Sequence, residues 1–322
     1  MDLIEVSGSH YEIGFQIGQA TAGQIAAVLS PKPLTPGFQK RVAVLAPLHE
    51  RAFPHLLKEI QGMADGSGQE FEKLLAWNFF EQAGCTSILA LGPGGFLAHN
   101  EDGNPVFRNH LSLVKMRIPR GQTIISLQYP GELGGNAVSV NSEGLVFSVN
   151  FIGPERLANV GYSANFLARE LLGARNLGEV RGILAGCRPR ADVYHWFVYS
   201  CSEGKALSIE LLKDRESIQE FREGLHFHTN HCLNPDSGNE PQGEDESSVA
   251  RLGRLPRFFR GEVTRDRAVR ALSDHRGKWP ICRHGGEGLL TLANVVVDLG
   301  SLEMRVAEGP TCRIREYFTA SV

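Results

Sequence analysis

One stretch, from Phe79 to Gly103, constrains the fold more than any other part of the chain. It contains a Gly-Cys-Thr-Ser step, an apolar run, a Pro-Gly-Gly turn and a second apolar run that ends in Asn-Glu-Asp-Gly. Two apolar runs around a Gly-rich turn are typical of a β-hairpin. A hairpin would place Cys85, at the start of its first strand, near Asp102, at the end of its second. We therefore expect a thiol, a neighbouring hydroxyl and a carboxylate to meet at one end of a sheet, as a candidate active site.

The segment before this hairpin is predicted to be mainly helical. Apolar residues recur at helical spacing after a Ser9 cap, and the small residues Gly14 and Gly18 permit close helix packing. A Pro-rich break at residues 30–37 precedes a second helical run. This second run is expected to end near Ala64, and a turn at 65–68 and a third helix over 71–82 follow it.

The pattern changes after Cys85, where short strand-like runs are bounded by Gly, Pro or Asn. Strands are expected at 113–118, 123–127, 137–140, 145–150, 193–201, 206–211, 225–229, 289–299 and 303–307, the last two as a final pair. Helices are expected at 163–172, 177–185, 247–259 and 264–274, and a polar surface loop at 234–246. This order suits an α/β (α+β) fold in which antiparallel sheets lie between helical layers.

Composition excludes several classes of protein. The chain has 322 residues, of which 42% are hydrophobic and 21% charged, with a net charge of −3. These values are typical of one large or two modest globular domains and give no electrostatic reason to expect nucleic acid or an anionic membrane surface as a partner. No apolar run approaches the ~18 residues of a membrane span, and the N-terminus lacks a signal pattern.

The cysteines indicate the compartment. Six cysteines are scattered along the chain without a C-x-x-C pair. Such spacing favours reduced thiols over a disulfide framework. We expect a cytoplasmic protein.

The Gly84-Cys85 step predicts a self-activating nucleophile. A cysteine nucleophile needs a base, and no histidine lies where sequence alone would pair it with Cys85. Cleavage of the peptide bond before Cys85 would free an α-amino group with a pKa of about 7.7–8.0, which can serve as that base. Gly84 permits strained backbone geometry and leaves its carbonyl open to the thiol. The expected chemistry is an N-to-S acyl shift followed by hydrolysis of the thioester.

Further motifs follow in a fixed order along nearly the whole chain, and each is short. They are Gly8-Ser9-His10-Tyr11-Glu12-Ile13-Gly14 with Gly18, Gly84-Cys85-Thr86-Ser87, His99-Asn100-Glu101-Asp102, Asn141-Ser142-Glu143-Gly144-Leu145, Val149-Asn150-Phe151, Thr229-Asn230-His231, Ser248 with Arg251, and Ile281-Cys282-Arg283-His284. With these motifs the chain resembles the self-cleaving isopenicillin N acyltransferase (penicillin acyltransferase) family of N-terminal-nucleophile hydrolases. The resemblance implies a four-layer αββα sandwich, with residues 1–84 as a helical pro-segment or α-subunit and 85–322 as the β-subunit of one domain.

The resemblance also implies roles for individual residues. Cys85 would be the nucleophile, and its freed amine the base, held by Asp102 through a charged hydrogen bond. Asn150 and Asn230 would stabilise the oxyanion, and Arg251 would anchor Asp102 or the cysteine terminus. The residues expected to contact substrate are Thr86, Glu101 and Phe151. His99 departs from the Arg of bile-salt-cleaving relatives, which argues against bile-salt hydrolysis.

Each of these residues also has an ordinary structural explanation. A cysteine at a strand start is usually a small buried hydrophobe, and Asn150 and Asn230 alone would be caps or turn formers. Arg251 on a helix would by default be a surface residue. The linked motifs favour the functional interpretation for these four residues, whereas Cys282 is expected to be structural.

His226, His228 and His231 suggest a metal site at first sight. The first two would share one face of a strand, but no carboxylate completes the set at a suitable spacing. The Gly-rich runs lack a phosphate-loop pattern. We expect neither a metal nor a cofactor.

The leading hypothesis is a self-processing cysteine amidohydrolase acting on a small linear amide. Its expected partners are that substrate and the two fragments of its own chain after cleavage, with no nucleic acid and no membrane. An acyl-CoA-dependent N-acyltransferase is the second hypothesis, in which an acyl-CoA is a substrate. An uncleaved, non-catalytic binding protein and a zinc hydrolase are the remaining alternatives. By family analogy, the substrate pocket would be lined by the helical first segment and by loops near residues 151–162.

Overall fold

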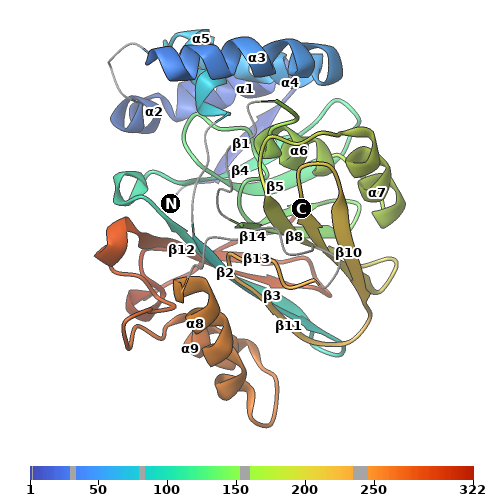
Figure 1. Ribbon diagram of the computed structural model, residues 1–322, viewed down its shortest axis with the longest axis vertical. Helices are drawn as coiled ribbons and strands as arrows, with labels where there is room; N and C mark the ends of the chain where they lie inside the picture. The colour runs from blue at the N-terminus through green and yellow to red at the C-terminus, as the bar shows by residue number, and fades with distance from the viewer. Residues whose placement is uncertain (2, 30–33, 80–83, 153–159, 235–245) are drawn as a thin grey trace.

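The computed structural model describes residues 1, 3–29, 34–79, 84–152, 160–234 and 246–322. Its strands form two sheets that pack between an upper and a lower helical layer (Figure 1). The Pro-rich residues 30–33, the end of the helix predicted over 71–82, most of the loop predicted at 234–246 and residues 153–159 of the predicted pocket wall lie outside the described residues.

The first sheet has eight strands in the order β1-β4-β5-β6-β7-β8-β9-β10. Only the β1–β4 pair among these is parallel. The strands are β1 (Leu3–Ser7), β4 (Ser112–Arg117), β5 (Thr123–Gln128), β6 (Ser139–Asn141), β7 (Leu145–Phe151), β8 (Tyr194–Ser200), β9 (Lys205–Leu211) and β10 (Glu216–Phe221). Residues from both sides of the Gly84–Cys85 step therefore share this sheet.

The second sheet has six strands in the order β11-β2-β3-β12-β13-β14, all antiparallel. The strands are β2 (Cys85–Leu91), β3 (Phe96–Gly103), β11 (Gly224–His228), β12 (Leu290–Asp298), β13 (Met304–Glu308) and β14 (Phe318–Ala320). Cys85 is the first residue of β2, so it lies at an end of this sheet.

Two helical layers cover the outer faces of the sheets. The upper layer in Figure 1 holds α1 (His10–Ala20), α2 (Ala22–Val28), α3 (Pro36–Ala52), α4 (Pro54–Ser67), α5 (Phe71–Trp77), α6 (Ala164–Leu171) and α7 (Leu177–Gly186). The lower layer holds α8 (Glu246–Arg254) and α9 (Arg265–Leu272). Short 3-10 helices are η1 (Pro105–Phe107), η3 (Leu255–Phe259), η4 (Gly286–Gly288) and η5 (Thr311–Arg313).

Helices α1 and α4 make a close backbone contact, as the glycines of α1 predicted. Ser9 caps α1 in a capping box with Glu12. A Cβ atom at Gly14 would lie only 1.8 Å from the carbonyl oxygen of Glu59, and one at Gly18 only 2.3 Å from that of Met63. Only glycine permits this approach of the two helices.

Three apolar clusters confirm the predicted four-layer αββα sandwich. One joins the upper helices to the eight-stranded sheet and includes Ile60 of α4 and Met116 of β4. A second fills the space between the sheets and includes Leu89 and Leu127. A third joins the six-stranded sheet to the lower helices and includes Leu272. Burial of apolar surface at these three interfaces is the main favourable term that holds the layers together.

The structure differs from the sequence prediction at some elements. Strands β1, β10 and β14 were not predicted; each is short and lies at the edge of a sheet, where pairing with a neighbour rather than apolar pattern decides the conformation. The expected final pair of strands is therefore followed by a third. Helix α4 continues through the predicted turn to Ser67 and ends at Gly68, whose φ is +68°.

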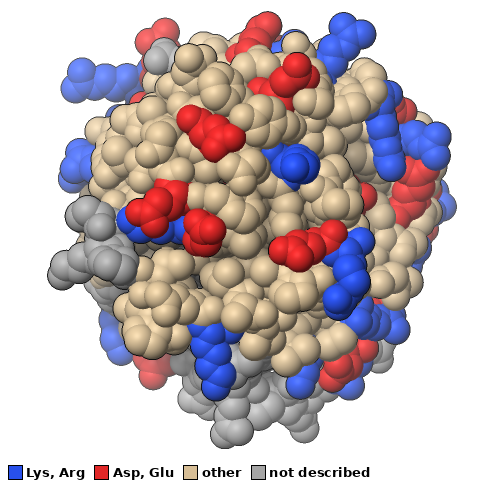
Figure 2. All heavy atoms as spheres, turned by 90° about the horizontal axis from the view of Figure 1, so that it is seen from above, with Lys and Arg blue, Asp and Glu red and all other residues tan. Residues whose placement is uncertain are grey.

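The surface of the upper face is mixed in charge. Figure 2 shows acidic and basic side chains interspersed among uncharged ones on this face. Among the described residues, no helix is both long and apolar enough to span a bilayer.

Candidate active site

The predicted hairpin is confirmed, and it places Cys85 opposite Glu101. Strands β2 and β3 pair in antiparallel register, with Cys85 beside Glu101 and Ser87 beside His99. Cross-strand neighbours in direct register point to the same face of a sheet. The carboxylate that shares a face with the thiol is therefore that of Glu101.

Strand alternation directs Asp102 to the opposite face. Leu89 of β2 packs between the sheets, whereas Ile88 packs against the lower helices. By the same two-residue period, Cys85 and Glu101 face the space between the sheets, while Thr86 and Asp102 face the lower helical layer. The sequence predicted that the thiol and Asp102 lie close, and the structure adds that they flank the strand end from two sides.

The Cys85 thiol is enclosed by buried polar groups. Its Sγ lies 3.5 Å from Glu101 Oε1, which also accepts a 2.7 Å hydrogen bond from the Tyr129 hydroxyl. Burial raises the pKa of the Cys85 thiol well above its usual range, and the negative charges of Glu101 and Asp102 raise it further. Burial likewise raises the pKa of Tyr129. In the intact chain the thiol is therefore protonated at neutral pH, and it needs a base to become a nucleophile.

A line of hydrogen bonds continues from Glu101 to the other sheet. Glu101 Oε2 lies 3.0 Å from His99 Nε2, and His99 Nδ1 lies 2.9 Å from Ser87 Oγ. Ser87 donates a 2.8 Å hydrogen bond to Asn150 Oδ1 on β7. Asn150 thus contacts Ser87 and holds the two sheets together beneath the thiol.

Both sides of the Gly84–Cys85 peptide bond are held by specific partners. The Gly84 carbonyl oxygen accepts a 2.9 Å hydrogen bond from the backbone N–H of Asp102. The Cys85 N–H donates a 3.1 Å hydrogen bond to Asn230 Oδ1. Gly84 has a φ of +106°, a backbone conformation that residues other than glycine rarely adopt.

Asn230 and Arg251 form a clamp around the backbone of Cys85. Arg251 donates hydrogen bonds of 2.8 Å to the Cys85 carbonyl, 2.7 Å to Thr86 Oγ1 and 2.6 Å to Asn230 Oδ1. Asn230 Nδ2 donates to the Phe151 carbonyl at 2.6 Å, and the Asn230 N–H donates to Ser248 Oγ at 2.6 Å. Arg251 was expected to anchor either Asp102 or the cysteine terminus, and these hydrogen bonds go to the cysteine terminus.

The Asp102 carboxylate is held by two groups that were not assigned a role from sequence. Thr291 Oγ1 donates a 2.5 Å hydrogen bond to Asp102 Oδ1, and Arg283 Nε lies 3.3 Å from Asp102 Oδ2. Burial raises the pKa of Asp102 to about 6, although the positive charges of Arg283 and Arg251 lower it. This carboxylate therefore changes charge near neutral pH.

The structure brings most of the predicted residues into one site. Glu101, Asp102, Asn230 and Arg251 surround Cys85, with Thr86 buried beneath Arg251. The Phe151 ring packs in the upper core, 5.3 Å from the Tyr194 ring centroid, and its carbonyl supports Asn230.

Three contributors had no assigned role: Tyr129, Arg283 and Thr291. Arg283 belongs to the Ile281-Cys282-Arg283-His284 motif, and this motif was the sequence signal that could have identified it. Tyr129 and Thr291 lie on separate segments without a local motif, and only the fold brings them to the site.

The three histidines weighed as metal ligands have separate partners. His226 stacks on Phe221, His228 lies 3.2 Å from Glu210, and His231 Nδ1 lies 2.7 Å from Ser248 Oγ. Among the described residues, neither group of side chains close enough to share a metal ion contains any of the three.

Comparisons with known proteins identify the family. The model of the family described as "Acyl-coenzyme A:6-aminopenicillanic acid acyl-transferase" matches residues 91–311. The chain is 29% identical over 214 residues to a Drosophila melanogaster protein named Beta-alanyl-dopamine/carcinine hydrolase, covering 55% of this chain and 55% of that protein. It thus spans about half the length of the curated relative that it matches.

Solved structures give weaker likenesses. A Caenorhabditis elegans ortholog of N-acylethanolamine-hydrolyzing acid amidase is 14% identical, with a TM-score of 0.47 over 67% of this chain and 93% of that chain. A conjugated bile acid hydrolase from Clostridium perfringens is 11% identical, with a TM-score of 0.46 over 74% of this chain and 92% of that chain. The family match covers more than half of the sequence and agrees with the resemblance carried by the motifs. The chain belongs to the acyl-coenzyme A:6-aminopenicillanic acid acyl-transferase family.

Proposed function

We propose that the chain cleaves itself between Gly84 and Cys85 and that the freed Cys85 residue then hydrolyses a small linear amide. The observation that carries this proposal is the pair of contacts across the scissile peptide. Its carbonyl accepts an N–H from Asp102, and its N–H donates to Asn230. A peptide held in this way has its carbonyl polarised and its leaving nitrogen oriented.

The cleavage step uses groups already in contact. The Cys85 thiol passes its proton to the Glu101 carboxylate, 3.5 Å away, and its sulfur attacks the Gly84 carbonyl carbon. The Asp102 N–H stabilises the negative charge that develops on the Gly84 oxygen. The C–N bond then breaks, the Cys85 nitrogen takes up the proton that Glu101 had accepted, and a thioester links Gly84 to the sulfur. Water hydrolyses this thioester and leaves a Gly84 carboxylate and a free Cys85 amine.

The same groups then serve amide hydrolysis. The new amine, with a pKa of about 7.7–8.0, accepts the thiol proton, so that a thiolate attacks the carbonyl of the substrate. The leaving amine takes that proton, and water hydrolyses the acyl-thioester. Arg251 and Asn230 hold the terminus during both steps, and Asp102 holds the amine.

The name of the Drosophila relative suggests which amides to test first. We propose β-alanyl-dopamine and carcinine as the first candidate substrates, because both are small linear amides of an amine. An acyl-CoA-dependent N-acyltransferase is the second candidate function, and the family to which the chain belongs favours it.

The first experiment is the intact mass of purified protein under denaturing conditions. Wild type should give two fragments that meet between Gly84 and Cys85, whereas Cys85→Ala should remain whole. Cys201→Ala is the matched control, because Cys201 is an exposed free cysteine that should not affect cleavage. An intact wild-type chain would remove the amine base from the mechanism and favour a binding protein.

The second experiment separates the two enzyme classes. Cleaved protein is incubated with each candidate amide, and the released amine is measured. An acyl-CoA is added in parallel, and free CoA is measured in the first turnover. Amine release without dependence on CoA supports the hydrolase, whereas a burst of CoA supports the acyltransferase.

A further inference from the structure

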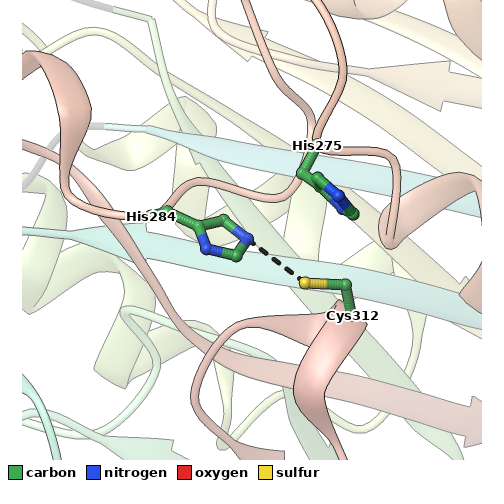
Figure 3. A group of neighbouring side chains, drawn as sticks. All are labelled: His275, His284 and Cys312. Atoms are coloured by element: carbon green, nitrogen blue, oxygen red, sulfur yellow. Dashed lines mark hydrogen bonds between the residues drawn. The ribbon is translucent and has the colours of Figure 1, made fainter.

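A second cluster of thiol and imidazole groups lies in the lower part of the molecule, outside the proposed active site. Figure 3 shows the ring of His284 directed at the sulfur of Cys312, with His275 beside them. The potential ligand atoms of these three residues all lie within 4.8 Å of one another. Cys282 lies beside this group, because its Sγ is 3.8 Å from His284 Nε2, which is 3.2 Å from Cys312 Sγ.

Two of the ligand-atom distances are close to those of a tetrahedral metal site. Zn–S bonds of about 2.3 Å and Zn–N bonds of about 2.0–2.1 Å at tetrahedral angles place neighbouring ligand atoms about 3.3–3.8 Å apart. The two sulfur-to-nitrogen distances of His284, 3.2 Å to Cys312 and 3.8 Å to Cys282, lie within about 0.4 Å of the roughly 3.5–3.6 Å that these bonds give for a sulfur–nitrogen pair. Cys282 lies outside the group whose ligand atoms are all within 4.8 Å of one another, so side chains must move to close a four-ligand set around one ion.

A hydrogen bond to the backbone fixes the tautomer of His275 that leaves one ring nitrogen able to bind a metal. Its Nδ1 lies 3.1 Å from the Ser273 carbonyl oxygen, which must receive an N–H. The proton is therefore on Nδ1, and Nε2 carries the lone pair. Metal-binding histidines commonly use such a carbonyl to fix their tautomer.

We propose that Cys282, His284, Cys312 and His275 bind one zinc ion in a Cys2His2 site. Two thiolates and two imidazoles are a ligand set that favours zinc over hard cations such as Mg²⁺ or Ca²⁺. His275 and His284 are exposed, so the ion can enter from solvent. This proposal departs from the absence of a metal expected from the sequence, in which His226, His228 and His231 are the histidines with a ligand-like spacing.

The ligands come from segments that are far apart in the chain. His275 follows α9, Cys282 and His284 precede β12, and Cys312 lies in η5. An ion bound by all three segments would hold the loop after α9 and the C-terminal part of the chain against the six-stranded sheet. Its role would be structural, since four protein ligands leave no open coordination position.

The site adjoins the candidate active centre through Arg283. This residue lies between two of the ligands in sequence, and its side chain extends the other way, to within 3.3 Å of Asp102 Oδ2. Its backbone N–H donates a 2.8 Å hydrogen bond to Thr291 Oγ1, which in turn donates to Asp102. Fixing Cys282 and His284 on a metal would therefore also fix the position of Arg283.

The test is metal binding by the full chain without an affinity tag, kept under reducing conditions. Elemental analysis should find about one zinc per chain. After chelation, Co²⁺ should give the sulfur-to-metal charge-transfer and visible bands of a tetrahedral thiolate site. Cys312→Ser should lose these bands and lower the Zn²⁺ affinity at least tenfold, whereas Cys201→Ser should match wild type. Added Zn²⁺ should raise the Tm of wild type and Cys201→Ser, but not that of Cys312→Ser.

Three results would overturn the proposal. These are the absence of a cobalt–thiolate band at stoichiometric Co²⁺, a band that is unchanged in Cys312→Ser, and a Cys282–Cys312 disulfide found by mass spectrometry of the reduced preparation. The same titration is made with Cys85→Ala, which should remain uncleaved. Because this variant tests metal binding without self-processing, failure of one proposal does not affect the other.

Discussion

The backbone N–H of Asp102 donates a 2.9 Å hydrogen bond to the carbonyl oxygen of Gly84. This contact points a fixed donor at the oxygen that must carry negative charge when the thiol attacks. The positive φ of Gly84 sets the direction of that carbonyl. The conformation at Gly84 should therefore control how fast the chain cleaves.

Gly84→Ala should slow self-cleavage at least tenfold. A Cβ atom there would lie 3.1 Å from Leu289 Cδ1 and 3.4 Å from Asp102 Cβ, at a φ that alanine adopts only with a cost of about 1–2 kcal/mol. The control is Gly92→Ala, with a similar φ of +118° and nothing within 4 Å of its Cβ. The fraction cleaved over time is measured by denaturing electrophoresis. Equal rates in the two variants would show that strain at Gly84 plays no part.

Asp102 should make the intact protein less stable as pH rises from about 4 to 6. Its pKa is raised from 3.8 to about 6 in the fold, so the native chain holds a proton there that the unfolded chain has lost. The stabilisation is complete below pH 4 and is lost as pH rises through 6, for a difference of about 3 kcal/mol. Urea unfolding of Cys85→Ala is compared with Cys85→Ala/Asp102→Asn at pH 4, 5 and 7. Parallel stability curves would contradict the raised pKa.

His49 should act in the opposite direction over nearly the same range. Burial lowers its pKa from 6.5 to about 4, so the unfolded chain binds a proton that the native chain excludes. This contribution is complete above pH 6.5 and is lost as pH falls toward 4, again by about 3 kcal/mol. His49→Gln should be less stable at pH 7, because the imidazole accepts the Ser163 N–H and contacts the Leu45 carbonyl. Its stability should nevertheless fall less than that of wild type on acidification.

The two effects oppose one another in the unmodified protein. Because both titrate between about pH 4 and 6.5, the stability of the parent chain shows only their difference. The Asp102→Asn and His49→Gln variants separate the two contributions. Each variant removes one titrating group and changes the slope of stability against pH in the direction given above.

Helix packing gives a prediction unconnected with catalysis. Gly14→Ala should destabilise the fold by about 3 kcal/mol or more, because its Cβ would lie 1.8 Å from the Glu59 carbonyl oxygen. Gly23→Ala, in α2, has nothing within 4 Å and should stabilise the fold by about 0.4–1 kcal/mol. Thermal unfolding checks both. A small effect at Gly14 would mean that α1 and α4 can separate readily.

Much of the fold was predictable because its patterns are local. The hairpin of β2 and β3 is marked by a Gly-rich turn between apolar runs, and the Ser9 cap marks the start of α1. The edge strands were missed because their conformation depends on pairing with distant residues. Strand β10, for example, is mostly polar and is fixed by its register with β9.

The candidate site was predictable to the extent that motifs carried it. Cys85 and Asn230 belong to short motifs with a recognisable order. The face on which each carboxylate lies could not be read from these motifs, since it requires the pairing of Cys85 with Glu101 and of Asp102 with Thr291. Tyr129 reaches the thiol only through the packing of one sheet on the other.

The pairing of β1 with β4 affects the order in which the chain folds and the fate of its fragments after cleavage. Leu3 to Ser7 leave the ribosome before Leu113 to Arg117, with which they pair, so β1 cannot join the sheet until β4 has emerged. Strand β1 therefore stays unpaired while the helices and the hairpin between it and β4 are made. After the proposed scission, the shorter piece would still supply a sheet edge and most of one helical layer. It would be a permanent component of a two-piece molecule, released only when the whole molecule melts.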